Sequence, residues 1–133
     1  MQIKKDIENI EDIKILLDDF YSQILQDETI GFVFKDIAQI NLATHMPKMY
    51  SFWDAVLFGS RAYNGSPILT HIELNKKITL KDDFFTQWKK LFFATIDKYF
   101  EGKIANLAKE KTIAMEHLMK MKIEDSSKKG FIQ

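Results

Sequence analysis

The sequence predicts an all-α fold. Apolar residues recur every three or four positions along four long stretches, which is the spacing of one helix face. No stretch shows a credible strand pattern. The chain has 133 residues, without internal repeats or Pro/Gly/Ser-rich linkers, which is the size of one domain. We therefore expect a single helical domain over residues 1–123, followed by a polar and flexible tail at 124–133.

The first long helix is expected to follow Asn9, whose side chain can cap it, with Asp12 three residues later as its capping-box partner. Its inner face shows helical periodicity through Ile10, Ile13, Leu17, Phe20, Tyr21, Ile24 and Leu25. Gly31 then opens a short apolar turn, GFVF.

The second long helix contains a proline, Pro47, in THMPKMYSFWDAVLFG. Proline is tolerated in the first turn of a helix and is disruptive further in. We therefore expect this helix to begin near Thr44, which can cap it, with His45 at its entrance and Gly59 at its end. An irregular connection follows, with a short helical turn expected around Pro67–His71.

The third helix is expected to begin after Thr79, with Asp82 as box partner, and to end at Gly102. Its inner side is aromatic, and a fourth helix follows from Ile104 through Met119. Four such helices could form a simple bundle. The connection between residues 59 and 79 is long for a bundle, however, and long connections tend to carry function.

Composition excludes several classes of function. The formal net charge is zero, which argues against a nucleic-acid partner. The absence of cysteine removes disulfides, thiolate metal sites and cysteine nucleophiles, and fits a reducing, cytoplasmic location. We expect no secretory signal and no membrane-spanning helix, since no apolar run is long enough. The three histidines lack the close spacing of a zinc site.

Aromatic residues and histidine form the combination that remains. Aromatic residues make up 13% of the chain, with 11 phenylalanines. A haem group requires one neutral imidazole for its iron, flat apolar walls and few polar donors on the ligand side. His71 lies between two aromatic helices, and Tyr21 and Trp88 fall on inner helix faces. A phenylalanine-rich core with a surface histidine remains the alternative interpretation.

The sequence resembles the truncated haemoglobins, and specifically their third group. The matching pieces are FYSQILQDETIGFVF, HMPKMYSFW, YNGSPILTHIEL and FFTQWKKLFF, which follow the order and spacing of the family over residues 20–93. The histidine in HMPKMYSFW, with the FW and YNGSP pieces, indicates the third group. The resemblance implies a two-over-two helical sandwich that holds one haem b.

The resemblance also implies roles for individual residues. His71 is similar to the proximal ligand of the haem iron. Three residues resemble the polar groups on the distal, ligand-binding side: Tyr21, Trp88 and His45. The others are similar to residues of the haem-pocket walls: Phe34, Met49, Phe52, Trp53, Tyr63, Ile68 and Leu74. Pro47 makes the role of His45 as a gate the least direct of these.

The function implied is binding of O2, and of NO or CO, at a pentacoordinate haem iron by a monomeric protein. An enzyme on the same cofactor is an alternative, of the NO dioxygenase or peroxidase type. It would require an external reductase, because the chain contains no reductase domain of its own. A haem-free helical interaction or sensor domain is a further alternative.

Overall fold

The computed structural model describes residues 3–37, 41–59 and 82–127. Its elements are α1 (Ile10–Gln26), the π-helix η1 (Val33–Ile37), α2 (Leu42–Phe58), α4 (Asp82–Tyr99) and α5 (Lys103–Ser127). No strand occurs within these ranges, and the all-α prediction is confirmed. No helix in the described part of the chain is both long and apolar enough to cross a membrane.

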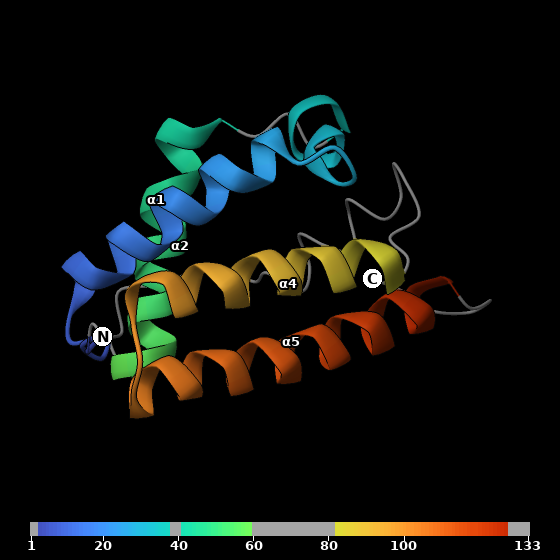
Figure 1. The fold of residues 1–133 in the computed structure, drawn as a ribbon. Coiled ribbons are helices and arrows are strands. Elements are labelled where there is room, and N and C mark those ends of the chain that lie inside the picture. Colours follow the sequence, from blue (N-terminus) through green and yellow to red (C-terminus); the bar gives the residue numbers. More distant parts are fainter. Residues whose placement is uncertain (1–2, 38–40, 60–81, 128–133) are drawn as a thin grey trace.

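The four long helices form two pairs. In Figure 1, α1 crosses α2, while α4 and α5 run side by side below them. Because only residues 100–102 separate α4 from α5, these two helices are antiparallel. Helix α1 also packs against α4, and α2 reaches α5, so that the two pairs share one core.

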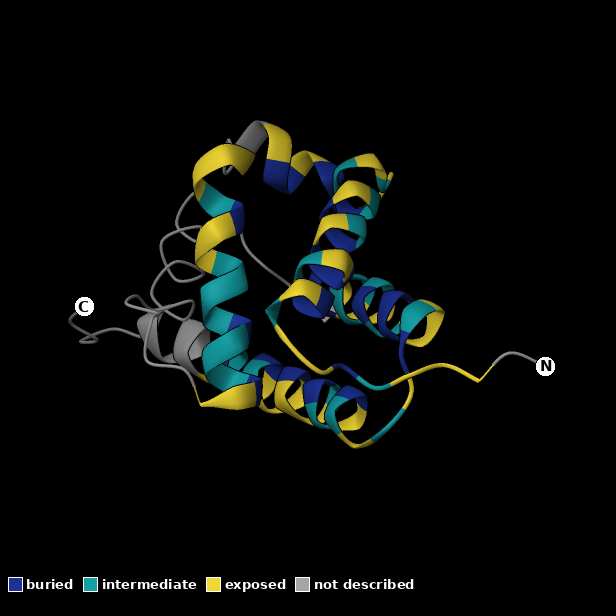
Figure 2. Cartoon of the chain, turned by 90° about the vertical axis from the view of Figure 1, so that its left-hand side faces the viewer, coloured by how far each residue is buried: buried dark blue, intermediate teal, exposed yellow. Residues whose placement is uncertain are grey.

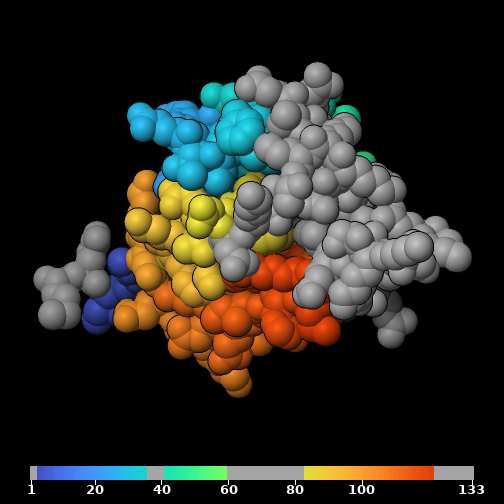
Figure 3. Space-filling view, turned by 90° about the vertical axis from the view of Figure 1, so that its right-hand side faces the viewer, coloured from blue at the N-terminus to red at the C-terminus, as the bar shows by residue number. Residues whose placement is uncertain are grey.

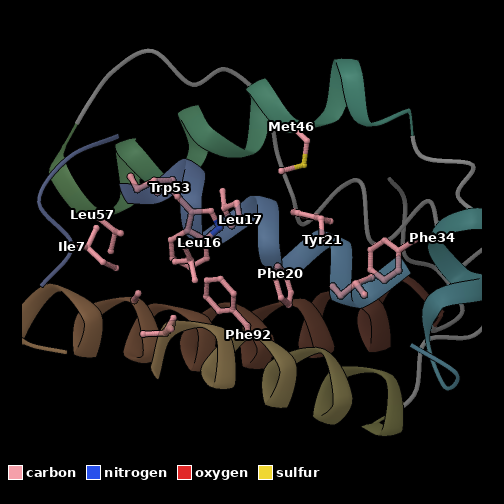
Figure 4. Packing of buried hydrophobic residues seen from close by; sticks show 14 of the residues in the cluster. Ile7, Leu16, Leu17, Phe20, Tyr21, Phe34, Met46, Trp53, Leu57 and Phe92 are labelled. Carbon is pink, nitrogen blue, oxygen red and sulfur yellow. The ribbon is translucent and has the colours of Figure 1, made fainter. Parts of the chain in front are cut away.

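The core is centred on the inner face of α1. Its residues Ile13, Leu17 and Ile24 are fully buried. Phe20 extends from the same face to Phe92 of α4, with ring centroids 4.8 Å apart. Trp53 of α2 meets that phenylalanine at 5.1 Å, so three helices converge on one aromatic cluster. Figure 4 shows Phe20 and Phe92 facing one another between α1 and α4.

Helix α1 begins as predicted. The Asn9 side chain accepts a hydrogen bond from the Asp12 amide at 3.1 Å. The Asp12 carboxylate in turn accepts from the amide of Glu8, one residue before the expected box position, and from the Lys5 ammonium. The buried Asp12 carboxylate therefore ties the residues before α1 to its first turn.

Helix α2 begins earlier than predicted. Asn41, not Thr44, is the cap, and its side chain accepts from the Ala43 amide at 3.0 Å. Thr44 lies in the first turn, where its hydroxyl donates to the Asn41 carbonyl. Pro47 therefore lies inside the helix. Because proline has no N–H, the backbone hydrogen bond from position 47 to the carbonyl of Ala43 is missing. Gly59 ends the helix as predicted, at a left-handed φ of 75°.

Gly102 has a different role from the one predicted. Helix α4 already ends at Tyr99, and Gly102 precedes α5, whose Asn106 amide donates to the Gly102 carbonyl. Gly102 has a φ of 145°, and a Cβ there would lie 2.6 Å from Asp6 Cγ. The space is taken by the Asp6 carboxylate, which accepts from the amides of Ile104 and Ala105, each at 2.8 Å.

The C-terminal boundary also differs from the prediction. Helix α5 continues to Ser127, past residue 124 where we expected a flexible tail. Polar composition does not stop a helix, and the first glycine of this segment is at position 130. The end of the tail, the expected cap Thr79 and the turn Pro67–His71 lie outside the described residues.

The Asp6 cap gives a testable prediction. Asp6→Ala should lower the free energy of unfolding by about 1 kcal/mol, because two amides at the start of α5 lose their acceptor. Burial raises the pKa of Asp6, but the hydrogen bonds from Ile104 and Ala105 outweigh it and leave the pKa below its usual value. Because its pKa is lowered in the folded state, the ionised Asp6 carboxylate stabilises the folded protein above about pH 4. This contribution to the free energy of unfolding is lost as pH falls through the folded-state pKa.

Urea unfolding followed from about pH 7 to about pH 3 measures both effects. Asp6→Asn is the control, because it keeps an acceptor and removes the charge. It should retain most of the stability at neutral pH and lack the acid-dependent loss. An unchanged unfolding midpoint in Asp6→Ala would contradict the cap.

Candidate functional site

Two of the three predicted distal residues meet across the α1–α2 contact. The ring of Tyr21, from α1, packs edge-on against the ring of His45, from the first turns of α2, with centroids 5.0 Å apart. Tyr21 is only 8% exposed, and its ring also contacts Phe34 of η1 at 6.5 Å. Figure 4 shows Tyr21 between α2 and the ring of Phe34. The structure thus brings together Tyr21, His45 and Phe34.

The environment of Tyr21 keeps its hydroxyl protonated. Burial raises the pKa of the phenol well above its usual value, because the phenolate would lose its hydration. Near neutral pH the group is therefore a hydrogen-bond donor and not an anion. Such a donor suits a ligand that carries partial negative charge.

A continuous row of ring contacts links this group to the third distal candidate, Trp88. From Phe34 the row passes to Phe84 of α4, stacked at 5.9 Å, and then to Phe85 at 5.2 Å. Trp88 follows one turn along α4, with its ring 6.5 Å from that of Phe85. The three residues predicted for the distal side, Tyr21, His45 and Trp88, are therefore connected by one row of aromatic rings from α1, α2, η1 and α4.

The row of rings crosses from η1 to α4 where Phe34 stacks on Phe84. Figure 3 shows residues of η1, in cyan, beside the first residues of α4, in yellow. Gly31 permits this fold-back, because a Cβ there would come within 3.0 Å of the Ile24 carbonyl oxygen at the end of α1. Asp27 holds the same turn by accepting from the amides of Thr29 and Ile30. Phe34 is thereby positioned between Tyr21 and Phe84.

Helix α2 carries two neighbouring stripes of residues that differ in burial within the described part of the chain. The first stripe, Met46, Trp53 and Leu57, is buried. The second stripe consists of four residues of intermediate burial: His45, Met49, Phe52 and Val56. Figure 2 shows that much of α2 has this intermediate burial, in teal. Their spacing places them on one helix face. A flat apolar group laid on this stripe would complete its burial.

These residues fit a haem group. The half-buried stripe and the row of aromatic rings offer apolar surface to a macrocycle, and His45 stands at the head of the stripe beside the protonated Tyr21. Of the predicted wall residues, Phe34 and Trp53 are buried, and Met49 and Phe52 pack against the core while partly exposed. Trp88 is half-buried in the same way.

The remaining predicted site residues cannot be placed. His71, Tyr63, Ile68 and Leu74 lie outside the described residues. The structure adds Phe84 and Phe85 to the site, because they connect Phe34 to Trp88. Their signal in the sequence was the FF pair at the start of the third helix, whose inner side we predicted to be aromatic without naming them as site residues.

Comparison with known proteins gives similarity to a truncated haemoglobin in both sequence and structure. No family model matches the chain. A group 3 truncated hemoglobin from Campylobacter jejuni subsp. jejuni is 28% identical over 102 residues, which is 74% of this chain and 78% of that protein. The crystal structure of a group III truncated hemoglobin from Campylobacter jejuni superposes with a TM-score of 0.76 at 25% identity, covering 90% of this chain and 94% of the other.

The fold and the site define a two-over-two helical sandwich of the globin type. The chain resembles the group III truncated haemoglobins in sequence and in fold over most of its length, as predicted from its sequence.

Burial of Tyr21 gives a second prediction. Its raised pKa means that the folded protein retains the phenolic proton at a pH where an unfolded tyrosine, with a pKa of about 10, has lost it. The contribution of Tyr21 to stability is therefore fully present below about pH 10 and is lost as pH rises through the folded pKa. Urea unfolding between about pH 9 and about pH 11 should show a shallower loss in Tyr21→Phe than in the wild type. Equal slopes would show that the phenol is not desolvated.

Proposed function

We propose that the protein binds one haem b and uses it to hold O2, NO or CO beside Tyr21. The observation that carries this proposal is the contact between Tyr21 and His45 at the head of the half-buried stripe. The similarity to truncated haemoglobins supports the proposal that the protein binds haem.

Each part of the chain has a distinct role in this proposal. The haem, when bound, supplies an iron that takes diatomic ligands. His71 would hold that iron from the proximal side, as the sequence predicts. The stripe of Met49, Phe52 and Val56 would exclude water from one face of the macrocycle. Tyr21 donates its phenolic proton to a hydrogen bond with the ligand, and the indole N–H of Trp88 is the second donor.

The expected consequence is slow release of oxygen. A hydrogen bond to a charged group contributes about 1.5–3 kcal/mol, which corresponds to roughly 10- to 150-fold in a dissociation rate when the bond is lost on release. Such a protein retains oxygen too tightly for transport and suits chemistry on the bound ligand. That enzymatic role, of the NO dioxygenase or peroxidase type, would require an external reductase. We propose a cytoplasmic monomer as its working form.

Haem binding is tested by absorption spectroscopy. The purified protein, reconstituted with haem, should show a Soret band that shifts on reduction and again on addition of CO. His71→Ala should lose or strongly alter the ferrous and CO spectra, because the proximal ligand is removed. His117→Ala is the matched control, since His117 is exposed on α5 and should leave the spectra unchanged. A wild type without a Soret band would select the haem-free alternative.

The distal donors are tested by oxygen dissociation. Tyr21→Phe should release O2 roughly 10- to 150-fold faster, and Trp88→Phe should accelerate release in the same direction. Tyr99→Phe is the control, because its hydroxyl donates to Asp19 on the α1–α4 contact, away from His45. Stopped-flow measurement of the three variants separates these effects. Unchanged rates in both distal variants would remove Tyr21 and Trp88 from the ligand site.

A further inference from the structure

Tyr50 of α2 joins α1 by two contacts beside the distal group. Its hydroxyl donates a hydrogen bond to the Asp18 carboxylate. The ammonium of Lys14, one turn earlier on α1, lies 5.8 Å from the centre of the Tyr50 ring. Asp18 is three residues before Tyr21 on α1, so the contact lies one helical turn from that tyrosine. Tyr50 is likewise one turn beyond Met46 on α2.

This contact lies at a boundary along the α1–α2 seam. On one side, the two helices are closely packed through the buried residues Leu17, Trp53 and Leu57. On the other side, the two helices border a depression of about 360 Å³, whose lining includes Tyr21 and Met46. Asp18 itself lines that depression. The hydrogen bond from Tyr50 to Asp18 therefore lies at the border between the closely packed part of the α1–α2 contact and the depression.

Pro47 weakens the connection between the two parts of α2. It lies between His45 and Tyr50 and has no N–H, so the hydrogen bond from position 47 to the carbonyl of Ala43 is missing. The turn that carries His45 is thus less firmly joined to the body of the helix. Tyr50 lies on the C-terminal side of Pro47, and its side chain connects that part of α2 to α1.

The Tyr50 hydroxyl remains a donor under ordinary conditions. Burial and the hydrogen bond to the negative Asp18 raise its pKa to about 12. The link is therefore intact near neutral pH, and no titration of the phenol is required for its action. Removal of the hydroxyl alone, by Tyr50→Phe, leaves the ring under Lys14 in place and isolates the hydrogen bond.

We propose that Tyr50, through Asp18, is a positioning residue that keeps the α1–α2 seam closed and so maintains the contact between Tyr21 and His45. The effect on the seam is independent of haem. Its consequence for ligand release rests on the proposed function, because the position of Tyr21 affects a ligand only if the protein binds haem and that ligand.

The chain offers a closely matched control. Tyr99 donates the same kind of hydrogen bond to Asp19, the neighbour of Asp18, but it joins α1 to α4. Tyr99→Phe thus removes a hydroxyl–carboxylate bond of the same type from α1 without touching the α1–α2 seam. Asp18→Asn is the second test variant, because it weakens the acceptor of the Tyr50 bond at similar side-chain size.

The first readout is amide hydrogen exchange of the purified protein, with or without haem. Exchange in the segment 42–49 should accelerate roughly 2- to 12-fold in Tyr50→Phe, which is the range that one ordinary hydrogen bond contributes to an equilibrium. Asp18→Asn should accelerate the same segment. Tyr99→Phe should leave it unchanged. Equal acceleration of 42–49 in Tyr50→Phe and Tyr99→Phe, or none in Tyr50→Phe, would overturn the positioning role.

The second readout separates this inference from the proposed function. In haem-loaded protein, Tyr50→Phe should release O2 faster than the wild type by no more than Tyr21→Phe does, and the double variant should release no faster than Tyr21→Phe alone. Additive rates would show that Tyr50 acts on the ligand by another route and would overturn the positioning role. A protein that takes up no haem contradicts the proposed function only, since the exchange experiment still decides the role of Tyr50.

Discussion

The structure depends on two successive residues of α1 that point in different directions. Neighbouring side chains on a helix lie roughly 100° apart, so Phe20 and Tyr21 cannot face the same partner. Phe20 is held in the core by Phe92, and the two rings of the pair Phe20–Tyr21 are 5.2 Å apart. Tyr21 is thereby directed toward α2 and η1, where it meets His45. The position of Tyr21 is therefore a consequence of core packing.

The second helix of the sandwich serves the core and the site with different faces. Its buried stripe, through Trp53, fixes its position against α1 and α4. Its half-buried stripe offers apolar surface to a cofactor, and His45 lies at the start of that stripe. Pro47 removes one backbone hydrogen bond between the turn of His45 and the rest of α2, which weakens the connection between them.

Local signals in the sequence predicted the features that depend on neighbouring residues. The Asn9 cap, the glycine at the end of α2 and the helical periodicity are all of this kind. The start of α2 could not be predicted as reliably, because Asn41 and Thr44 are both good caps and only the surrounding structure selects between them. Asp6 at the start of α5 is separated from its partner Ile104 by 98 residues, and no local pattern reveals such a contact. The resemblance implied that Tyr21 and His45 lie on the same side of a haem, and the structure adds that their rings are in contact. Spacing alone does not show which helices cross.

In the proposed function, Tyr21 is positioned by the core so that it donates a hydrogen bond to a ligand on a haem iron. The vibrational spectrum of the ferrous CO complex tests this most directly, because the C–O stretching frequency responds to a donor beside the ligand oxygen. We expect a lower frequency in the wild type than in Tyr21→Phe, since the phenol draws electron density toward that oxygen. Identical frequencies in the two proteins would contradict it.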